Sequence, residues 1–186
     1  MFLEESRWVM NRINEIEDVK SILDIGSADI NYREEKQPYI SKMYSSVGIK
    51  IDTLDLKEAE GVDYVRDITE RECVNGLDKY DVVLVCNLLE HIIPTKIDTV
   101  LDNIYMLLKS KSYCIVTVPY NIGFHPSPID NGFRPNVDEL ENIFSSRFEK
   151  VITEKVICSH YREPYLSNPD LLPLPEVTCG VMRKRL

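Results

Sequence analysis

The run DVVLVC at residues 81–86 constrains the fold of this chain more than any other segment. Three valines and one leucine among six residues are typical of a strand that is buried on both faces, as in a parallel sheet. Shorter or less regular apolar runs of the same kind occur at residues 21–26, 49–54, 62–65 and 112–119. We therefore expect these segments to lie side by side as strands of one buried sheet.

Helical patterns accompany these strands. Apolar residues between Ile97 and Leu108 repeat at helical spacing, and residues 2–16 and 136–144 each place apolar side chains on one face. Asn136 and Glu139 have the spacing of a capping box at the start of the last of these helices. Strands that alternate with helices predict an α/β fold with a mostly parallel sheet.

The last two apolar runs, at residues 150–158 and 176–183, have no helical pattern between them and predict an antiparallel hairpin at one edge of the sheet. The complete expectation is a doubly wound, mostly parallel sheet of seven strands with the strand SILDI (21–25) in its interior. At 186 residues, the chain has the usual length of one domain, so we expect residues 1–186 to form a single unit.

Composition and charge exclude several classes of protein. The net charge of 22 − 31 = −9 argues against binding to nucleic-acid phosphates. Five cysteines without a CxxC pair read as buried thiols in a reducing compartment, and the three histidines lack metal-ligand spacing, so we expect no metal. An acidic N-terminus and the absence of an apolar run of about 20 residues predict a cytoplasmic protein without a membrane partner.

Residues at the ends of the predicted strands point to a ligand. In a doubly wound sheet the ligand lies outside the carboxyl ends of the strands, where glycine allows a close approach of the backbone. Gly26 follows the first strand, and Asp55 follows the second at the position from which a carboxylate can bind both hydroxyls of a ribose. Asp52, three residues earlier, is the alternative for this role. Asp67 follows the third strand, where a charged start of a loop is an equally good interpretation.

Two longer stretches, ILDIGSADI (22–30) and DKYDVVLVCNLLEHI (78–92), resemble motifs of the class I S-adenosylmethionine-dependent methyltransferases. The resemblance extends over about residues 20–150, and residues 119–135 are more weakly similar to small bacterial methyltransferases of surface-glycan loci. Ala28 and Ile30 stand where the family has glycines. The resemblance implies a Rossmann-like methyltransferase domain that uses S-adenosylmethionine as its cofactor.

The resemblance also assigns cofactor-binding residues. Asp24, Gly26 and Ser27 would lie beside the methionine part, and a bond from Asp24 to its own turn is the less favoured alternative. The remaining cofactor-binding positions are Asp55 at the ribose, Asp67 at the adenine amino group, Ile68 against the adenine ring, and Asn87 and Leu88 near the methionine end. Carboxylates near Glu90 would suit the positive sulfonium, whereas His91 is more simply a packing residue.

Methyl transfer is an in-line displacement that requires an aligned acceptor and, for a hydroxyl acceptor, a base. In the long loop at 120–135, His125 is the candidate base, Tyr120 the candidate orienting group and Arg134 a candidate ligand for an anionic acceptor. An exposed loop histidine is the competing interpretation of His125. We expect a small polar acceptor, such as a hydroxyl of a sugar or a related metabolite, and the oligomeric state stays open.

Two other functions remain as alternatives. A non-catalytic protein that binds a cofactor or a partner on the same fold would explain the loss of glycines from the first turn. A nicotinamide-dependent oxidoreductase also uses a glycine turn and an acid after the second strand, but the GxGxxG pattern is absent here.

Overall fold

The computed structural model describes residues 2–27, 48–123, 130–159 and 173–186. In chain order its elements are α1 (Leu3–Glu15), β1 (Ser21–Ile25), β2 (Lys50–Asp55), β3 (Tyr64–Val65), η1 (Arg71–Val74), β4 (Tyr80–Cys86), η2 (Leu89–His91), η3 (Pro94–Lys96), α3 (Ile97–Leu107), β5 (Leu108–Pro119), α4 (Val137–Phe144), β6 (Phe148–Ile157) and β7 (Glu176–Lys184).

The strands form one seven-stranded sheet in the order β3-β2-β1-β4-β5-β7-β6 among the described residues. Strands β1 to β5 pair in parallel, and β7 is antiparallel to both β5 and β6. This arrangement confirms the predicted α/β fold, the interior position of β1 and the C-terminal antiparallel hairpin. Because β7 inserts beside β5, the outer strand of the hairpin is β6.

Two predicted boundaries were wrong. The strand expected at residues 62–65 begins only at Tyr64, because the Val62 N–H closes a turn onto the Ala59 carbonyl, at 3.1 Å. The strand expected at 112–119 begins at Leu108, where we had extended the preceding helix. Helix α3 passes directly into β5, and Lys111 in that transition has a positive φ of 61°.

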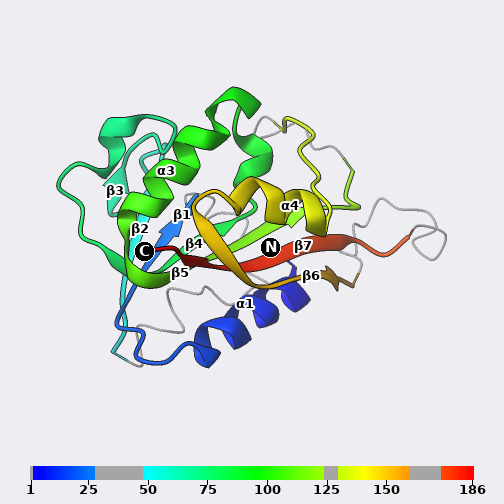
Figure 1. Ribbon diagram of the computed structural model, residues 1–186. Helices are drawn as coiled ribbons and strands as arrows, with labels where there is room; N and C mark the ends of the chain where they lie inside the picture. The colour runs from blue at the N-terminus through cyan, green and yellow to red at the C-terminus, as the bar shows by residue number, and fades with distance from the viewer. Residues whose placement is uncertain (1, 28–47, 124–129, 160–172) are drawn as a thin grey trace.

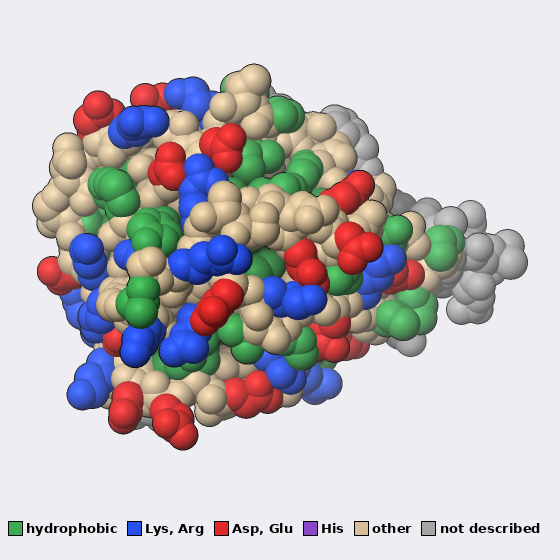
Figure 2. Space-filling model, viewed as in Figure 1, with side chains coloured by type: hydrophobic (Ala, Val, Ile, Leu, Met, Phe, Trp, Pro, Cys, Tyr) green, Lys and Arg blue, Asp and Glu red, His purple; other side chains and the backbone are tan. Residues whose placement is uncertain are grey.

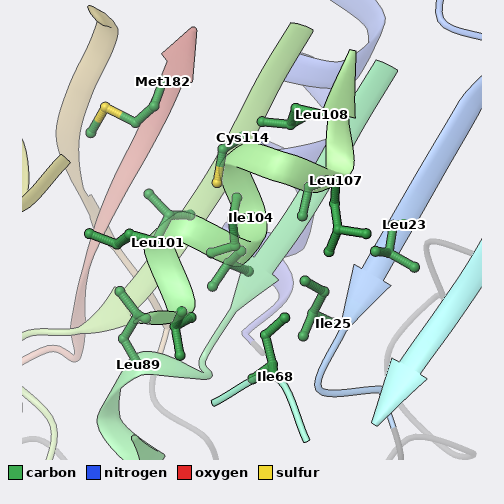
Figure 3. Packing of buried hydrophobic residues seen from close by; sticks show 14 of the residues in the cluster. Leu23, Ile25, Ile68, Leu89, Leu101, Ile104, Leu107, Leu108, Cys114 and Met182 are labelled. Atoms are coloured by element: carbon green, nitrogen blue, oxygen red, sulfur yellow. The ribbon is translucent and has the colours of Figure 1, made fainter. Parts of the chain in front are cut away.

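Helices cover both faces of the sheet (Figure 1). Helix α1 packs Trp8, Val9 and Ile13 against one face, over a cluster that includes Val82 and Leu84. Helices α3 and α4 cover the opposite face, and the capping box predicted at the start of α4 is present. The side chains shown from this second cluster include Leu101, Ile104 and Leu107 of α3 and Leu23 and Ile25 of β1 (Figure 3).

The alternation of side chains along the strands determines which residues face α1. Leu23 and Ile25 belong to the α3 side and Ile22 to the α1 side, so the side chain of Asp24 also points toward α1. In β4 and β5 the same alternation puts Cys86 and Thr117 on the α1 side. The polar residues at the carboxyl ends of three neighbouring strands therefore lie under the N-terminal helix.

None of the helices in the described ranges is long and apolar enough to cross a membrane. On the face shown in Figure 2, Lys and Arg side chains are interspersed with Asp and Glu side chains, so this face has no broad patch of one sign.

Candidate functional site

The turns after β1 and β4 contact each other at the carboxyl edge of the sheet. Gly26 has a φ of +84°, and its N–H donates to the Leu54 carbonyl of β2 at 2.8 Å. A Cβ atom at Gly26 would lie 3.1 Å from Cδ1 of Leu88. The structure thus brings together Gly26 and Leu88, two of the residues that the sequence assigned to cofactor binding.

At the end of β2, the structure distinguishes Asp55 from Asp52. Asp55 is the last residue of the strand, and its Oδ1 accepts the Lys57 N–H at 2.8 Å. Asp52 is buried inside the sheet, where Oδ2 accepts the Tyr80 hydroxyl at 2.7 Å and the Lys50 ammonium at 2.8 Å. Burial is the largest cause of the raised pKa of the Tyr80 hydroxyl, and its hydrogen bond to Asp52 adds to the rise. Asp52 therefore has a structural role inside the sheet, whereas Asp55 lies at the carboxyl end of β2.

The segment that follows β3 is held in place by hydrogen bonds from helix α3. Asp67 Oδ1 accepts the Thr69 N–H at 2.8 Å, and Ile68 is buried in the same cluster as Ile25 (Figure 3). The amide of Asn103, buried on α3, donates to the Ile68 carbonyl at 2.8 Å and to the Glu70 carbonyl at 2.9 Å. The position of Asp67 thus depends on a residue of α3.

A buried network that the sequence analysis missed connects α1 to the ends of β4 and β5. Glu5 is fully buried, and its Oε1 accepts the Thr117 hydroxyl at 2.6 Å and the Asn87 amide at 2.9 Å. Glu5 Oε2 accepts the Phe2 N–H at 2.9 Å. Asn87 has a φ of +50°, and its own N–H donates to the Thr117 carbonyl at 2.9 Å. A signal was available, since Glu5 shares one helical face with Val9 and Ile13.

Glu90 is a second buried carboxyl at this edge, directly beyond the fourth strand. Glu90 is 1% exposed, its Oε1 lies 3.8 Å from Nε2 of His91, and its Oε2 has no hydrogen-bond partner in the described part of the chain. Burial raises the pKa of Glu90 to about 8, and the charge of Glu5 contributes to this rise. A carboxyl in such a site is largely protonated at neutral pH.

The segment that begins at residue 130 holds the turn that contains Glu90 in place. The Asn131 N–H donates to the Glu90 carbonyl at 2.7 Å, and its side-chain amide donates to the carbonyls of Leu89 and Ile92. The guanidinium of Arg134 binds the buried carboxylate of Asp130 at 2.5 and 3.1 Å.

We expected Arg134 to hold an anionic group of an acceptor. In the structure its guanidinium is engaged within the protein, since it also donates to the carbonyls of Ile122 at 3.2 Å and Phe133 at 3.0 Å. Arg134 therefore stabilises the loop that holds the Glu90 turn.

Of the two predicted catalytic residues, the structure describes Tyr120 only. The Tyr120 N–H donates to the Glu176 carbonyl at 2.9 Å, and the ammonium of Lys155 lies 3.4 Å from the centre of the Tyr120 ring. This cation–π contact directs Tyr120 toward the β6–β7 hairpin. His125 lies outside the described residues, as do Ala28 and Ile30.

Among the described residues, the turns after β1 and β4 contain two buried polar atoms without a hydrogen-bond partner, Ser27 Oγ and Glu90 Oε2. Buried polar atoms are normally satisfied, so an orphaned pair at one edge of a sheet fits a site completed by a polar ligand. The backbone at Gly26 and the acids at the strand ends agree with a nucleoside-containing group. Within the described ranges, no cluster of three or more His, Cys, Asp or Glu residues is arranged to bind a metal.

The chain matches 697 chains of solved structures. Among them are S-adenosylmethionine-dependent methyltransferases, and the chain has the same fold as these. No protein-family model and no curated protein matches it in sequence.

Among the structural neighbours is the N-methyltransferase NodS from Bradyrhizobium japonicum in complex with S-adenosylhomocysteine, at 11% identity and a TM-score of 0.63 over 98% of this chain and 87% of NodS. A 1,6-didemethyltoxoflavin N1-methyltransferase from Burkholderia thailandensis, with its substrate and S-adenosylhomocysteine bound, has 17% identity and a TM-score of 0.66 over 97% and 76%. An S-adenosylmethionine-dependent methyltransferase from Archaeoglobus fulgidus has 16% identity and a TM-score of 0.63 over 97% and 93%.

Proposed function

We propose that this protein is an enzyme that transfers a methyl group from S-adenosylmethionine to a small polar acceptor. The observation that carries the proposal is the carboxyl edge of the sheet. There the Gly26 turn contacts Leu88, and two buried polar atoms, Ser27 Oγ and Glu90 Oε2, lack partners among the residues that the structure describes. S-adenosylhomocysteine, the demethylated form of this cofactor, is present in NodS and in the toxoflavin methyltransferase, which share the fold.

The site residues have the following proposed roles. The ribose would bind Asp55, because Asp52 is occupied by Tyr80 and Lys50. The methionine part would lie beside Asp24, Gly26, Ser27, Asn87 and Leu88, and the adenine beside Asp67 and Ile68.

Two acceptor chemistries enter the proposal. A sugar hydroxyl is our prediction from the loop at 120–135, with His125 as the base. The toxoflavin enzyme and NodS are named as N-methyltransferases, which supports nitrogen as the other acceptor atom.

Calorimetric titration with S-adenosylmethionine, S-adenosylhomocysteine and NAD tests the cofactor assignment. We expect both sulfur compounds to bind one site and NAD to give no heat of binding. Binding of NAD alone would favour the oxidoreductase alternative. Tight binding without turnover on any panel of amines and hydroxyl compounds would favour the non-catalytic alternative.

A further inference from the structure

Glu90 is a buried acid at this edge whose Oε2 has no hydrogen-bond donor among the described residues. Glu5, another fully buried acid, has both oxygens bonded, to Thr117, Asn87 and the Phe2 backbone. A buried carboxyl that is paired inside the protein is a structural element, whereas one with an unpaired oxygen has capacity left for a ligand. Glu90 Oε2 therefore has hydrogen-bonding capacity left for a ligand.

The charges around Glu90 come from three elements. Glu5 on α1 and Asp130 on the loop after β5 disfavour its ionisation, whereas Arg134 on the same loop favours it. His91, its neighbour on η2, lies with Nε2 at 3.8 Å from Oε1. Because Arg134 is already paired with Asp130 at 2.5 Å, its positive charge is largely neutralised by that carboxylate. A cationic ligand beside Glu90 would add positive charge there and favour its ionisation.

We propose that Glu90 is the proton acceptor of the transfer reaction, and that it ionises when a positively charged cofactor binds at the carboxyl edge of the sheet. This inference rests on the proposed function. S-adenosylmethionine supplies a methyl group on a positively charged sulfur, whereas the demethylated product is neutral at sulfur.

Protons and charges balance through one cycle. When the cation binds, the Oε2–H bond of Glu90 breaks and the proton goes to solvent, so that a carboxylate faces the positive charge. During transfer the acceptor oxygen or nitrogen gains the methyl group and loses its proton, which forms a new O–H bond on Glu90. The protein is then left with a neutral carboxyl beside a neutral product, as before binding.

Calorimetry in two buffers with different ionisation enthalpies measures the predicted proton release without any acceptor. With a pKa of about 8, Glu90 is about nine-tenths protonated at pH 7. If the bound cation lowers its pKa to about 6, S-adenosylmethionine releases about 0.8 proton, and S-adenosylhomocysteine releases almost none. The affinity for S-adenosylmethionine should also rise about twentyfold from pH 6.5 to pH 8.5, with no such rise for the product.

Glu90→Gln is the critical variant, because it preserves shape and cannot ionise. We expect it to abolish the proton release, to weaken S-adenosylmethionine at pH 8.5 at least tenfold, and to leave S-adenosylhomocysteine within twofold of wild type. Glu72→Gln, an exposed carboxylate on η1, is the matched control and should behave as wild type in all three measurements.

The outcomes separate the two proposals. If neither sulfur compound binds the wild-type protein, the proposed function fails and Glu90 has no cationic cofactor to meet. If both bind with equal proton release, the linked charge is the amino group that they share, and the inference about Glu90 is wrong. If Glu90→Gln leaves the proton release unchanged and His125→Ala abolishes it, the group that releases the proton is His125 and not Glu90.

Discussion

At the scale of single residues, Asp52 and Asp55 lie three positions apart on β2 and differ completely in their surroundings. Asp52 has the Tyr80 hydroxyl and the Lys50 ammonium as partners inside the fold. Asp55 ends the strand at the edge where Gly26 and Leu88 meet. Substituting the two acids should therefore separate stability from binding.

Asp55→Ala should weaken S-adenosylmethionine at least tenfold in a calorimetric titration. The ribose would lose two charge-assisted hydrogen bonds, each worth about 1.5–3 kcal/mol before compensation. Asp52→Ala is the control, with little effect on affinity and a lower unfolding midpoint in urea. The reverse result would show that Asp52 binds the ribose.

Gly26→Ala should lower the free energy of unfolding by more than the backbone strain of a positive φ accounts for. A φ of +84° costs an L-residue about 1–2 kcal/mol, and the new methyl would press against Leu88 at 3.1 Å. Gly76, with a φ of +72° and no atom within 4 Å of its added Cβ, provides the matched control. Urea unfolding should show a larger loss for Gly26→Ala than for Gly76→Ala, and equal losses would contradict the Leu88 contact.

At the scale of elements, the two sheet faces supply different parts of the site. Helix α1 delivers Glu5 to the ends of β4 and β5 from one face. Helix α3 holds the segment after β3 from the other face through Asn103. The site residues on the strands are therefore positioned by helices that lie far from them in sequence.

Asn103→Leu should lower the free energy of unfolding by about 1–3 kcal/mol, because it leaves the carbonyls of Ile68 and Glu70 without their donor. The displaced segment carries Asp67, so the affinity for S-adenosylmethionine should fall as well. Thermal unfolding and calorimetry measure the two effects. An exposed residue of the same helix, Met106, offers the control Met106→Leu.

At the scale of the whole molecule, the buried carboxyl of Glu90 links stability to pH. Its pKa is raised in the folded protein from an ordinary 4.5 to about 8. The folded state therefore binds more protons than the unfolded state between these values, and stability falls as pH rises through this window. The contribution is fully present below pH 4.5 and is lost above about pH 8.

Glu90→Gln should remove this dependence. Relative to wild type, the variant should gain stability as the pH rises from 5 to 9, by up to about 4 kcal/mol if the whole pKa difference is realised. Urea unfolding of both proteins at several pH values provides the measurement, and the difference between them cancels the other titrating groups. Parallel stability curves would mean that Glu90 is ionised in the folded protein.

Much of the fold was predictable because burial on two faces leaves a strong local pattern. The strand at 81–86, the stripe of apolar residues in α3 and the capping box of Asn136 are all readable within a few residues, and each appears in the structure. The start of β5 was not readable, since Leu108 continues the helical stripe and only its pairing with Tyr80 makes it a strand residue. Pairing across a sheet is decided by distant residues.

The strand-end positions of Asp24, Gly26, Asp55 and Asn87 followed from the sequence by itself, because parallel strands bring their carboxyl ends to one edge. What those side chains contact was decided by the tertiary structure. The Glu5 carboxylate meets Thr117 across 112 residues of chain, and local pattern showed it only as a polar residue on an apolar helix face. The raised pKa of Glu90 likewise arises from burial and from Glu5, which only the folded chain brings near it.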